Sequence, residues 1–480
     1  MLPGFYLPRR GRKPLSGQQK LAQKLALLRQ KSFKQMGEIF EDFIPRTLLK
    51  PEQSGVMSRR RIFSKENTFW AFLGQVLDAD GGCKEVIRKL QSYASVKGIN
   101  VPSSSTASYC TARNKLDEQM LVEIFAHTAD RLDKMPATGL LNNRRVIVVD
   151  GTGVSMPDTP ENQEVWPQIS SQKPGCGFSS ARICACFSLE SGALLSYAMG
   201  NKKSHELPLF RKQWNIFKDG DIFLGDKGFC SYFDIANLEG HGVDSVVTLA
   251  RRAPVRPADS LKKLGPNDLL ITWKRPAYNA ILSYSKEAWE ALPKELVLRQ
   301  IKVRVKYPGF RTKWFHIVTT LLDAAQYPAE ELAELYFKRW DVELFFRDIK
   351  TTMGMDILRC LTPEMVRREI VMHFIAYNCI RRLMCEAAEE ADVEVRVVSF
   401  KGSVQALRSW EPHLNQAKIS RTERSRLISD LYEAMTNTTI RQRPGRSEPR
   451  CLKRRPKSYQ LLTSPRHEMK EIQHRSRYHV

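Results

Sequence analysis

Four groups of strand-like residues between positions 144 and 250 most constrain how this chain can fold. They are rich in β-branched and aromatic residues: RRVIVVD from Arg144, ARICACFSLESGALLSYAMG from Ala181, DIFLGD from Asp221 and DSVVTLA from Asp244. A helix-like stretch, SHELPLFRKQWNIF, lies between the second and third groups. Strands that alternate with helices predict a mixed α/β sheet.

An aspartate closes two of these apolar runs. Asp150 follows VIVV and Asp226 follows IFLG, and a glycine-containing turn comes after each. The carboxyl ends of strands open into the crevice where α/β proteins bind their ligands, so both side chains are candidates for a functional site. Taken alone, each aspartate could equally be a turn or helix-capping residue.

A predicted helix over residues 328–352 carries polar residues that share one face. At about 100° per residue, a sector of about 60° holds Tyr336, Arg339, Glu343 and Lys350. The opposite side is apolar, with Val342, Phe345 and Ile349, so the helix is expected to bury that side in a core. By pattern alone, the polar face could instead be a solvated, salt-bridged surface.

The carboxylates Asp150, Asp226 and Glu343 would need a cation if the fold brings them together. At an effective dielectric constant of about 20, each pair would repel by about 4 kcal/mol. Ligand sets made only of oxygen favour Mg²⁺, for which Mn²⁺ can substitute. Two such ions can activate an attacking hydroxyl and stabilise the leaving oxygen of a phosphodiester. These residues therefore indicate phosphoryl transfer.

The chain is strongly basic, with 76 Lys and Arg against 52 Asp and Glu in 480 residues and a net charge of +24. Residues 1–34 carry nine basic and no acidic side chains, and residues 441–480 carry twelve basic and three acidic ones. Such tails can bind a phosphate backbone, although they can also serve only solubility. A basic chain of this kind most commonly meets nucleic acid.

Residues 66–135 read as several short helices, punctuated by Gly81, Gly82 and Pro102. Beside a basic arm, this pattern is similar to a helix-turn-helix DNA-binding unit, with Ser105–Leu116 as its recognition helix. The candidate DNA-contacting residues are Thr106, Ser108, Tyr109, Arg113, Asn114 and Lys115. A plain helical bundle is the alternative.

Several other classes of protein lack their sequence signals here. The N-terminus is basic without a signal-peptide apolar run, and the longest uncharged apolar run, Ile370–Ile380, is too short to span a bilayer. Cys184 and Cys186, with Cys176 and His205, have no second pair at zinc-ligand spacing. The sequence also lacks a glycine-rich phosphate loop and a serine-nucleophile elbow. We therefore expect a soluble, intracellular protein without a membrane span.

The polar face of the predicted helix matches the signature of a known family. Tyr336, Arg339, Glu343 and Lys350 fit Y-x2-R-x3-E-x6-K, and VVDGTG and GDKGFCSY precede them in the right order. The sequence thus resembles the DDE transposases of bacterial insertion sequences, in the insertion-sequence-four group. The resemblance extends from RRRIFS and TFW near residue 60 to RPKSYQLL near residue 460.

This resemblance implies an α/β catalytic domain with a ribonuclease-H-like mixed sheet, interrupted by a β-rich insertion and flanked by all-α DNA-binding regions. Independently of it, the stretch from 252 to 320 reads as β-rich. We expect a basic arm and helical DNA-binding domain at 1–140, the catalytic domain at 141–251 and 323–400, the β-rich insertion at 252–322, and a helical, basic DNA-binding or dimerisation region at 401–480.

The resemblance also assigns roles to single residues. The catalytic triad that would bind two Mg²⁺ ions is Asp150, Asp226 and Glu343. The residues expected to hold phosphates near the scissile bond are Tyr336, Arg339 and Lys350. Trp314 lies where a relative stacks a tryptophan on a base flipped out during hairpin formation, with a strand-buried Trp as the alternative.

The implied function is that of a transposase, an endonuclease and strand transferase. It would bind the terminal inverted repeats of its mobile element in double-stranded DNA, cut there and join the freed 3′-hydroxyl to target DNA. Because two ends are handled together, a homodimer in a synaptic complex is expected, in the bacterial cytoplasm at the nucleoid. Two alternatives stay open: a non-catalytic DNA-binding relative, and a structure-selective nuclease on the same fold.

Overall fold

A computed structural model of the chain describes most residues between 39 and 439. The described residues are 39–40, 43–58, 62–96, 101–135, 140–169, 173, 175–201, 204–249, 253–279, 284–304, 314–414, 419–439, 464–465 and 468–469. The basic tail at 1–34, and the tail at 441–480 apart from those last four residues, lie outside the described part. The chain divides into two compact units, Met1–Ile124 with Val404–Leu431, and Phe125–Ser403 with Tyr432–Val480.

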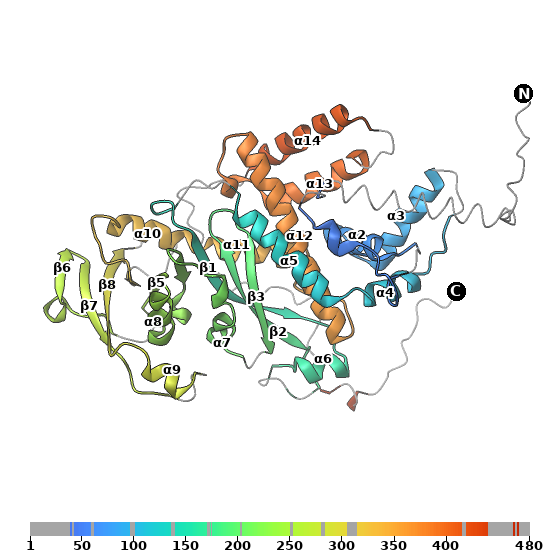
Figure 1. Ribbon diagram of the computed structural model, residues 1–480. Coiled ribbons are helices and arrows are strands. Elements are labelled where there is room, and N and C mark those ends of the chain that lie inside the picture. Colours follow the sequence, from blue (N-terminus) through green and yellow to red (C-terminus); the bar gives the residue numbers. More distant parts are fainter. Residues whose placement is uncertain are drawn as a thin grey trace, which may run out of the picture. The chain divides into compact units, whose positions relative to one another are not determined.

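A nine-stranded sheet forms the framework of the second unit (Figure 1). Its strands are β1 (Val146–Ser155), β2 (Ser180–Ser188), β3 (Leu194–Asn201), β4 (Ile222–Gly225), β5 (Asp244–Thr248), β6 (Lys262–Gly265), β7 (Asp268–Lys274), β8 (Glu295–Arg304) and β9 (Trp314–Thr319), in the spatial order β3-β2-β1-β4-β5-β9-β8-β7-β6. β1 is antiparallel to β2 and parallel to β4, and β4 is parallel to β5. The predicted mixed α/β sheet is confirmed, and its first five strands fit a ribonuclease-H-like order.

Helices cover both faces of the sheet. Successive strand residues point to opposite sides, so the apolar strands present side chains that need to be buried on both faces. The helices are α6 (Pro160–Val165), α7 (Glu206–Arg211), α8 (Tyr232–Gly240), α9 (Lys286–Glu290), α10 (Ala329–Lys338), α11 (Asp341–Arg347) and α12 (Pro363–Glu390). On one face, Val149 of β1 shares a buried cluster with Phe210 of α7. On the other face, Phe187 of β2 contacts Phe345 of α11 and Tyr377 of α12.

The segment at 252–322 contributes β6–β9 to this same sheet. β9 pairs antiparallel with β5, where Val246 lies opposite Thr319, so the later strands continue the main sheet. A buried ion pair stabilises the extension. The guanidinium of Arg299 in β8 binds both carboxylate oxygens of Asp268, and its Nη1 donates to the Tyr327 carbonyl oxygen at 2.6 Å.

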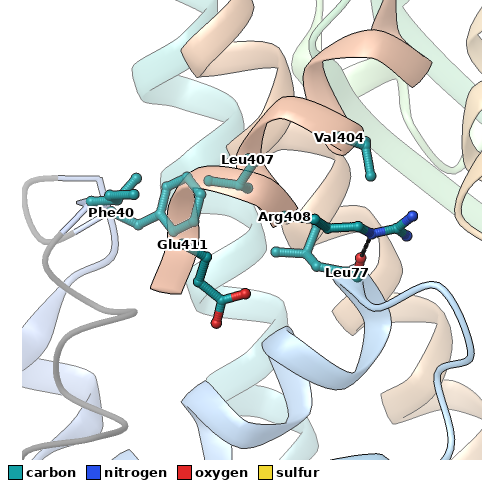
Figure 2. A pocket seen from close by; sticks show the side chains of 7 residues that line it. Phe40, Leu77, Val404, Leu407, Arg408 and Glu411 are labelled. Atoms are coloured by element: carbon teal, nitrogen blue, oxygen red, sulfur yellow. Dashed lines mark hydrogen bonds between the residues drawn. The ribbon is translucent and has the colours of Figure 1, made fainter. Parts of the chain in front are cut away.

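The first unit is helical and combines segments from both ends of the chain. It contains α2 (Lys65–Leu77), α3 (Cys83–Val96), α4 (Ala107–Asn114), the start of α5 (Glu118–Asp133) and most of α13 (Phe400–Leu414) and α14 (Arg421–Thr436). Figure 2 shows how α13 is attached: Arg408 Nε donates to the Leu77 carbonyl oxygen at 2.6 Å, beside Phe40 and Leu407. These hydrogen-bonded residues are 331 positions apart in the sequence.

Two further observations concern the length of the apolar helices and the state of the cysteines. Within the described ranges, no helix combines the length and the apolar character that a membrane crossing requires. The cysteines described by the structure, Cys184 and Cys186 among them, are free thiols.

We expect Arg299→Leu to lower the free energy of unfolding by about 3–5 kcal/mol, because it leaves the Asp268 carboxylate buried without its partner. The matched control is Arg256→Leu, which removes an ion pair whose side chains are 81% and 52% exposed and should change stability little. Urea unfolding of both variants measures the difference. Equal, small effects would contradict a stabilising role for the buried pair.

Candidate active site

The parallel pairing of β1 with β4 brings two aspartates together. The register ends with Val149 opposite Gly225, so Asp150 and Asp226 are the next residues along the two strands. Adjacent strands lie about 5 Å apart, and paired residues point to the same face. Asp226 leaves its strand at once, as the Oδ1 of its carboxylate accepts a hydrogen bond from Gly228 N at 2.6 Å.

The pairing of β1 with β2 shows which face Asp150 occupies. Asp150 lies opposite Ala185, two residues along from the pair of Val148 and Phe187. Because side chains alternate, Asp150 points to the same side as Phe187, which contacts Phe345 of α11. The aspartate therefore faces the side of the sheet that α11 covers.

The carboxyl group of Asp150 is in an unfavourable place for a negative charge. Its pKa is raised to about 6, chiefly by burial and also by the carboxylates of Asp226 and Glu206. The hydrogen bond that Gly151 N donates at 2.7 Å and the positive charge of Arg339 limit this rise. Burial disfavours the ionised form because it removes water from the charge. A cation beside Asp150 and Asp226 would reverse that penalty.

The signature segment is not one straight helix. It consists of α10, α11 and a π-helical turn, Asp348–Thr352. At the junction the hydrogen bonds tighten to three-residue spacing, from Val342 N to Arg339 O and from Glu343 N to Trp340 O. The prediction of a continuous helix over 328–352 is therefore wrong, although Val342, Phe345 and Ile349 are buried as predicted.

Tyr336 and Arg339 belong to the interior of the site. They are 4% and 7% exposed, which excludes a solvated face for these two residues. The Tyr336 hydroxyl is hydrogen-bonded to Thr248 Oγ1 at 2.9 Å, and the Arg339 guanidinium lies over the Tyr336 and Trp340 rings at 5.7 and 5.1 Å. Burial raises the pKa of Tyr336, Arg339 lowers it, and the nearby Asp226 adds to the rise. The two side chains therefore lie close to the paired aspartates.

Glu343 and Lys350 belong to elements that lie near β1. Glu343 is exposed on α11, which contacts β1. Lys350 Nζ pairs with Asp356 Oδ1 at 3.3 Å, and the backbone of Asp356 accepts from Ser155 N at the end of β1. In the part of the chain that the structure describes, no three His, Cys, Asp or Glu side chains are grouped so as to hold a metal ion. Glu343 as a third metal ligand therefore stays a prediction.

Glu206 is a neighbour of this site that sequence reasoning missed. It begins α7, and its Oε1 would lie 2.2 Å from a Cβ built on Gly151, so only glycine leaves room for it. Arg182 Nη1 lies 3.5 Å from the same carboxylate. The signal in the sequence is slight: a glycine directly after Asp150, and an acid in the first turn of a short helix.

Trp314 begins β9 and is 44% exposed. Two cations of the neighbouring strand lie at its ring, Lys302 Nζ at 4.8 Å from the ring centre and Arg304 Cζ at 5.7 Å. The alternative of a strand-buried tryptophan does not fit this exposure.

Comparisons with known proteins bear on this arrangement. A family model described as "Transposase DDE domain" matches residues 142–379, a span that contains Asp150, Asp226 and the whole signature segment. The chain is also 26% identical over 413 residues to "Transposase InsG for insertion sequence element IS4" of Escherichia coli (strain K12), which covers 85% of this chain and 89% of that relative. The chain belongs to the DDE transposases. The resemblance to the insertion-sequence-four group is confirmed.

Two further matches are more limited. The "Probable transposase for insertion sequence element IS5377" of Geobacillus stearothermophilus is 33% identical over 84 residues, which is 18% of this transposase and 22% of that relative. A solved structure, a piggyBac transposase synaptic complex with hairpin DNA, aligns at a TM-score of 0.40 with 12% identity, covering 88% of this chain and 87% of that chain. The family assignment rests on the domain match and the relative from Escherichia coli.

The raised pKa of Asp150 should make this transposase less stable as the pH rises. The folded state holds the proton to about pH 6, whereas an unfolded Asp releases it near pH ~3.9. The loss of folding stability caused by ionised Asp150 should therefore grow between these two pH values and stay constant above them. In metal-free buffer, we expect Asp150→Asn to be more stable than the wild type by about 3 kcal/mol above pH ~7, with no difference near pH ~4.

Urea unfolding at a series of pH values in EDTA measures this difference. Asp348, whose pKa burial also raises to about 6, is present in both proteins, so its effect cancels. A stability difference that does not change with pH would contradict the assignment of this titration to Asp150.

Proposed function

We propose that this transposase binds the terminal inverted repeats of its mobile element, cleaves those ends by metal-dependent phosphoryl transfer, and joins the freed 3′-hydroxyl to target DNA. The observation that carries the proposal is the parallel pairing that puts Asp150 beside Asp226, on the face covered by α11. The relative InsG is named as a transposase for an insertion sequence element, which supports the same substrate.

The paired aspartates fit a divalent metal by their chemistry. Both offer oxygen atoms, which Mg²⁺ and Mn²⁺ prefer, and a cation would offset the burial that disfavours ionised Asp150. Glu343 would complete the ligand set from α11, for two Mg²⁺ ions in all. Bound there, the metal would activate the attacking hydroxyl and stabilise the leaving oxygen.

Arg339 is suited to hold a phosphate of the scissile strand. It is a buried guanidinium, and its Nε has no hydrogen-bond partner among the described residues. A phosphate oxygen would satisfy that donor and neutralise the buried charge. The guanidinium of Arg339 lies over the Tyr336 ring, which helps to hold it in place. Lys350 would add a second positive charge near the end of β1.

DNA binding would involve more of the chain than this site. The net charge is +24, and residues 1–34 and 441–480 carry most of the excess. We expect these tails to follow the phosphate backbone, which makes binding weaken steeply as salt is raised. Pairing of two element ends calls for a homodimer on DNA, and the site of action would be the bacterial cytoplasm, at the nucleoid.

Trp314 supports the finer proposal that cleavage passes through a DNA hairpin. An exposed aromatic ring can stack on a base that leaves the duplex, at a gain of about 1–3 kcal/mol. Lys302 and Arg304, which flank the ring, would meet the phosphates on either side of that base.

We expect Glu343→Gln to retain end binding and to lose Mg²⁺-dependent cleavage by about 100-fold or more, because the amide is a poor ligand for the metal. Gel assays on a labelled duplex with the terminal inverted repeat, with and without Mg²⁺, measure both steps. The control is Glu334→Gln, the same change at an exposed residue of α10, which should cleave normally.

The same assay separates the rival functions. Undiminished nicking by Glu343→Gln would remove this residue from the triad. Binding by the wild type without any cleavage would favour a non-catalytic DNA-binding protein. Cleavage of branched DNA without preference for the inverted repeat would favour a structure-selective nuclease.

We expect Trp314→Ala to keep the first nick but to reduce hairpin formation by about tenfold or more, because the flipped base loses its stacking partner. Trp314→Phe keeps an aromatic face and should recover most of the hairpin product. Denaturing gels that separate nicked strand from hairpin measure the ratio. Equal ratios in the wild type and both variants would exclude a stacking role.

A further inference from the structure

Within the first unit, one face of helix α4 packs against α2. Tyr109 is fully buried and its hydroxyl donates to Gln75 Oε1 at 2.6 Å. Arg113 Nη1 donates to the same oxygen at 3.0 Å, and its guanidinium lies over the Phe72 ring at 4.8 Å. Two of the residues that the sequence offers as DNA contacts, Tyr109 and Arg113, therefore hold α4 against α2.

The opposite face of α4 is exposed and has a distinct composition. Its exposed residues are Ala107, Ser108, Thr111, Asn114 and, directly after the helix, Lys115. Their spacing of one, four, seven and eight positions puts them on one side of a helix. Short side chains allow the helix backbone to approach a partner closely, and this face offers hydroxyl, amide and ammonium groups but no carboxylate.

A groove runs beside this face. It has a volume of about 830 Å³ and lies between α4 and the residues around a tight turn at Gly55–Ser58, where Ser58 Oγ donates to Gly55 O at 2.7 Å. Its residues on the turn side are Gly55, Val56, Met57, Ile62 and Phe63. Among the described residues that line it, Lys115 carries a charge.

We propose that the exposed face of α4 enters the major groove of the element-end DNA, and that the protein groove beside α4 borders this contact. The inference rests on the proposed function, since it names the part of the transposase that reads the end sequence. An α-helix fits the width of the major groove, and Ser, Thr, Asn and Lys side chains pair with base edges and phosphates. A face that carries Lys115, hydroxyl groups and an amide but no acid is complementary to DNA, whereas an apolar protein partner would leave these polar groups unpaired.

The test compares affinities for two labelled duplexes at one salt concentration by fluorescence anisotropy. One duplex carries the terminal inverted repeat that flanks the reading frame, and the other is a scrambled duplex of the same composition. Lys115→Glu and Thr111→Phe should weaken binding to the repeat duplex by about tenfold or more, and binding to the scrambled duplex much less. Both residues are exposed, so unchanged thermal unfolding is expected and is measured on the same samples.

The control is Lys84→Glu, the same charge reversal at an exposed residue of α3 in the same unit, outside the groove. It should weaken binding to both duplexes slightly and equally. Dimethyl sulfate footprinting gives an independent readout, because it reports guanine N7 in the major groove. The wild type should protect guanines in the repeat that remain reactive with Lys115→Glu.

The outcomes separate this inference from the function on which it rests. A wild type that cleaves and prefers the repeat duplex, with α4 variants that bind like the wild type, overturns the inference and leaves the transposase function intact. A wild type without preference for the repeat duplex overturns both. Equal loss with Lys84→Glu and Lys115→Glu also overturns it, because the effect would then be general electrostatics.

Discussion

The parallel register of β1 and β4 is the constraint on which the rest of this site depends. It makes Asp150 and Asp226 neighbours on one face, although they are far apart in the sequence. A shift of one residue would turn Asp150 to the side of α7, away from α11. Burial of Val148 and Val149 on opposite faces of β1 stabilises this register, because a shift of the strand by one residue would move both side chains out of their buried positions.

Bringing these carboxylates together costs stability, and the surrounding residues limit that cost. Arg339 supplies a positive charge near Asp150 and is itself buried against two aromatic rings. On the opposite face of β1, Glu206 lies close to Gly151. Its carboxylate adds negative charge near Asp150 and so increases the cost of ionising that aspartate. The chain alone therefore leaves the site with excess negative charge, which is the condition under which a divalent cation binds well.

The sequence predicted the parts of this site that depend on local pattern. Asp150 and Asp226 could be found because each follows an apolar run, and the buried side of the signature segment followed from its periodicity. The expectation that Asp150 ends its strand before a turn is wrong, since β1 continues through Gly151 to Ser155 in its pairing with β2. The sequence did not predict the break between α10 and α11, because a short α-helix, a tight junction and a π turn have the same apolar spacing over so few residues. The extension of the sheet by β9 and the attachment of α13 to α2 depend on pairings between distant segments, for which a single sequence carries no local signal.

The inward turn of Tyr109 and Arg113 shows why residue type alone misleads about recognition. Tyrosine and arginine are common DNA contacts, yet here they share the buried acceptor Gln75 and are used to fix the helix. At the signature segment, too, burial differs among polar residues: Tyr336 and Arg339 are buried, while Glu343 on α11 is exposed. On α4 the long polar side chains hold the helix against α2, and the exposed residues face outward on a helix that is already held in place. That rigidity favours precise contact, because a helix that is fixed before it meets DNA loses little conformational freedom on binding.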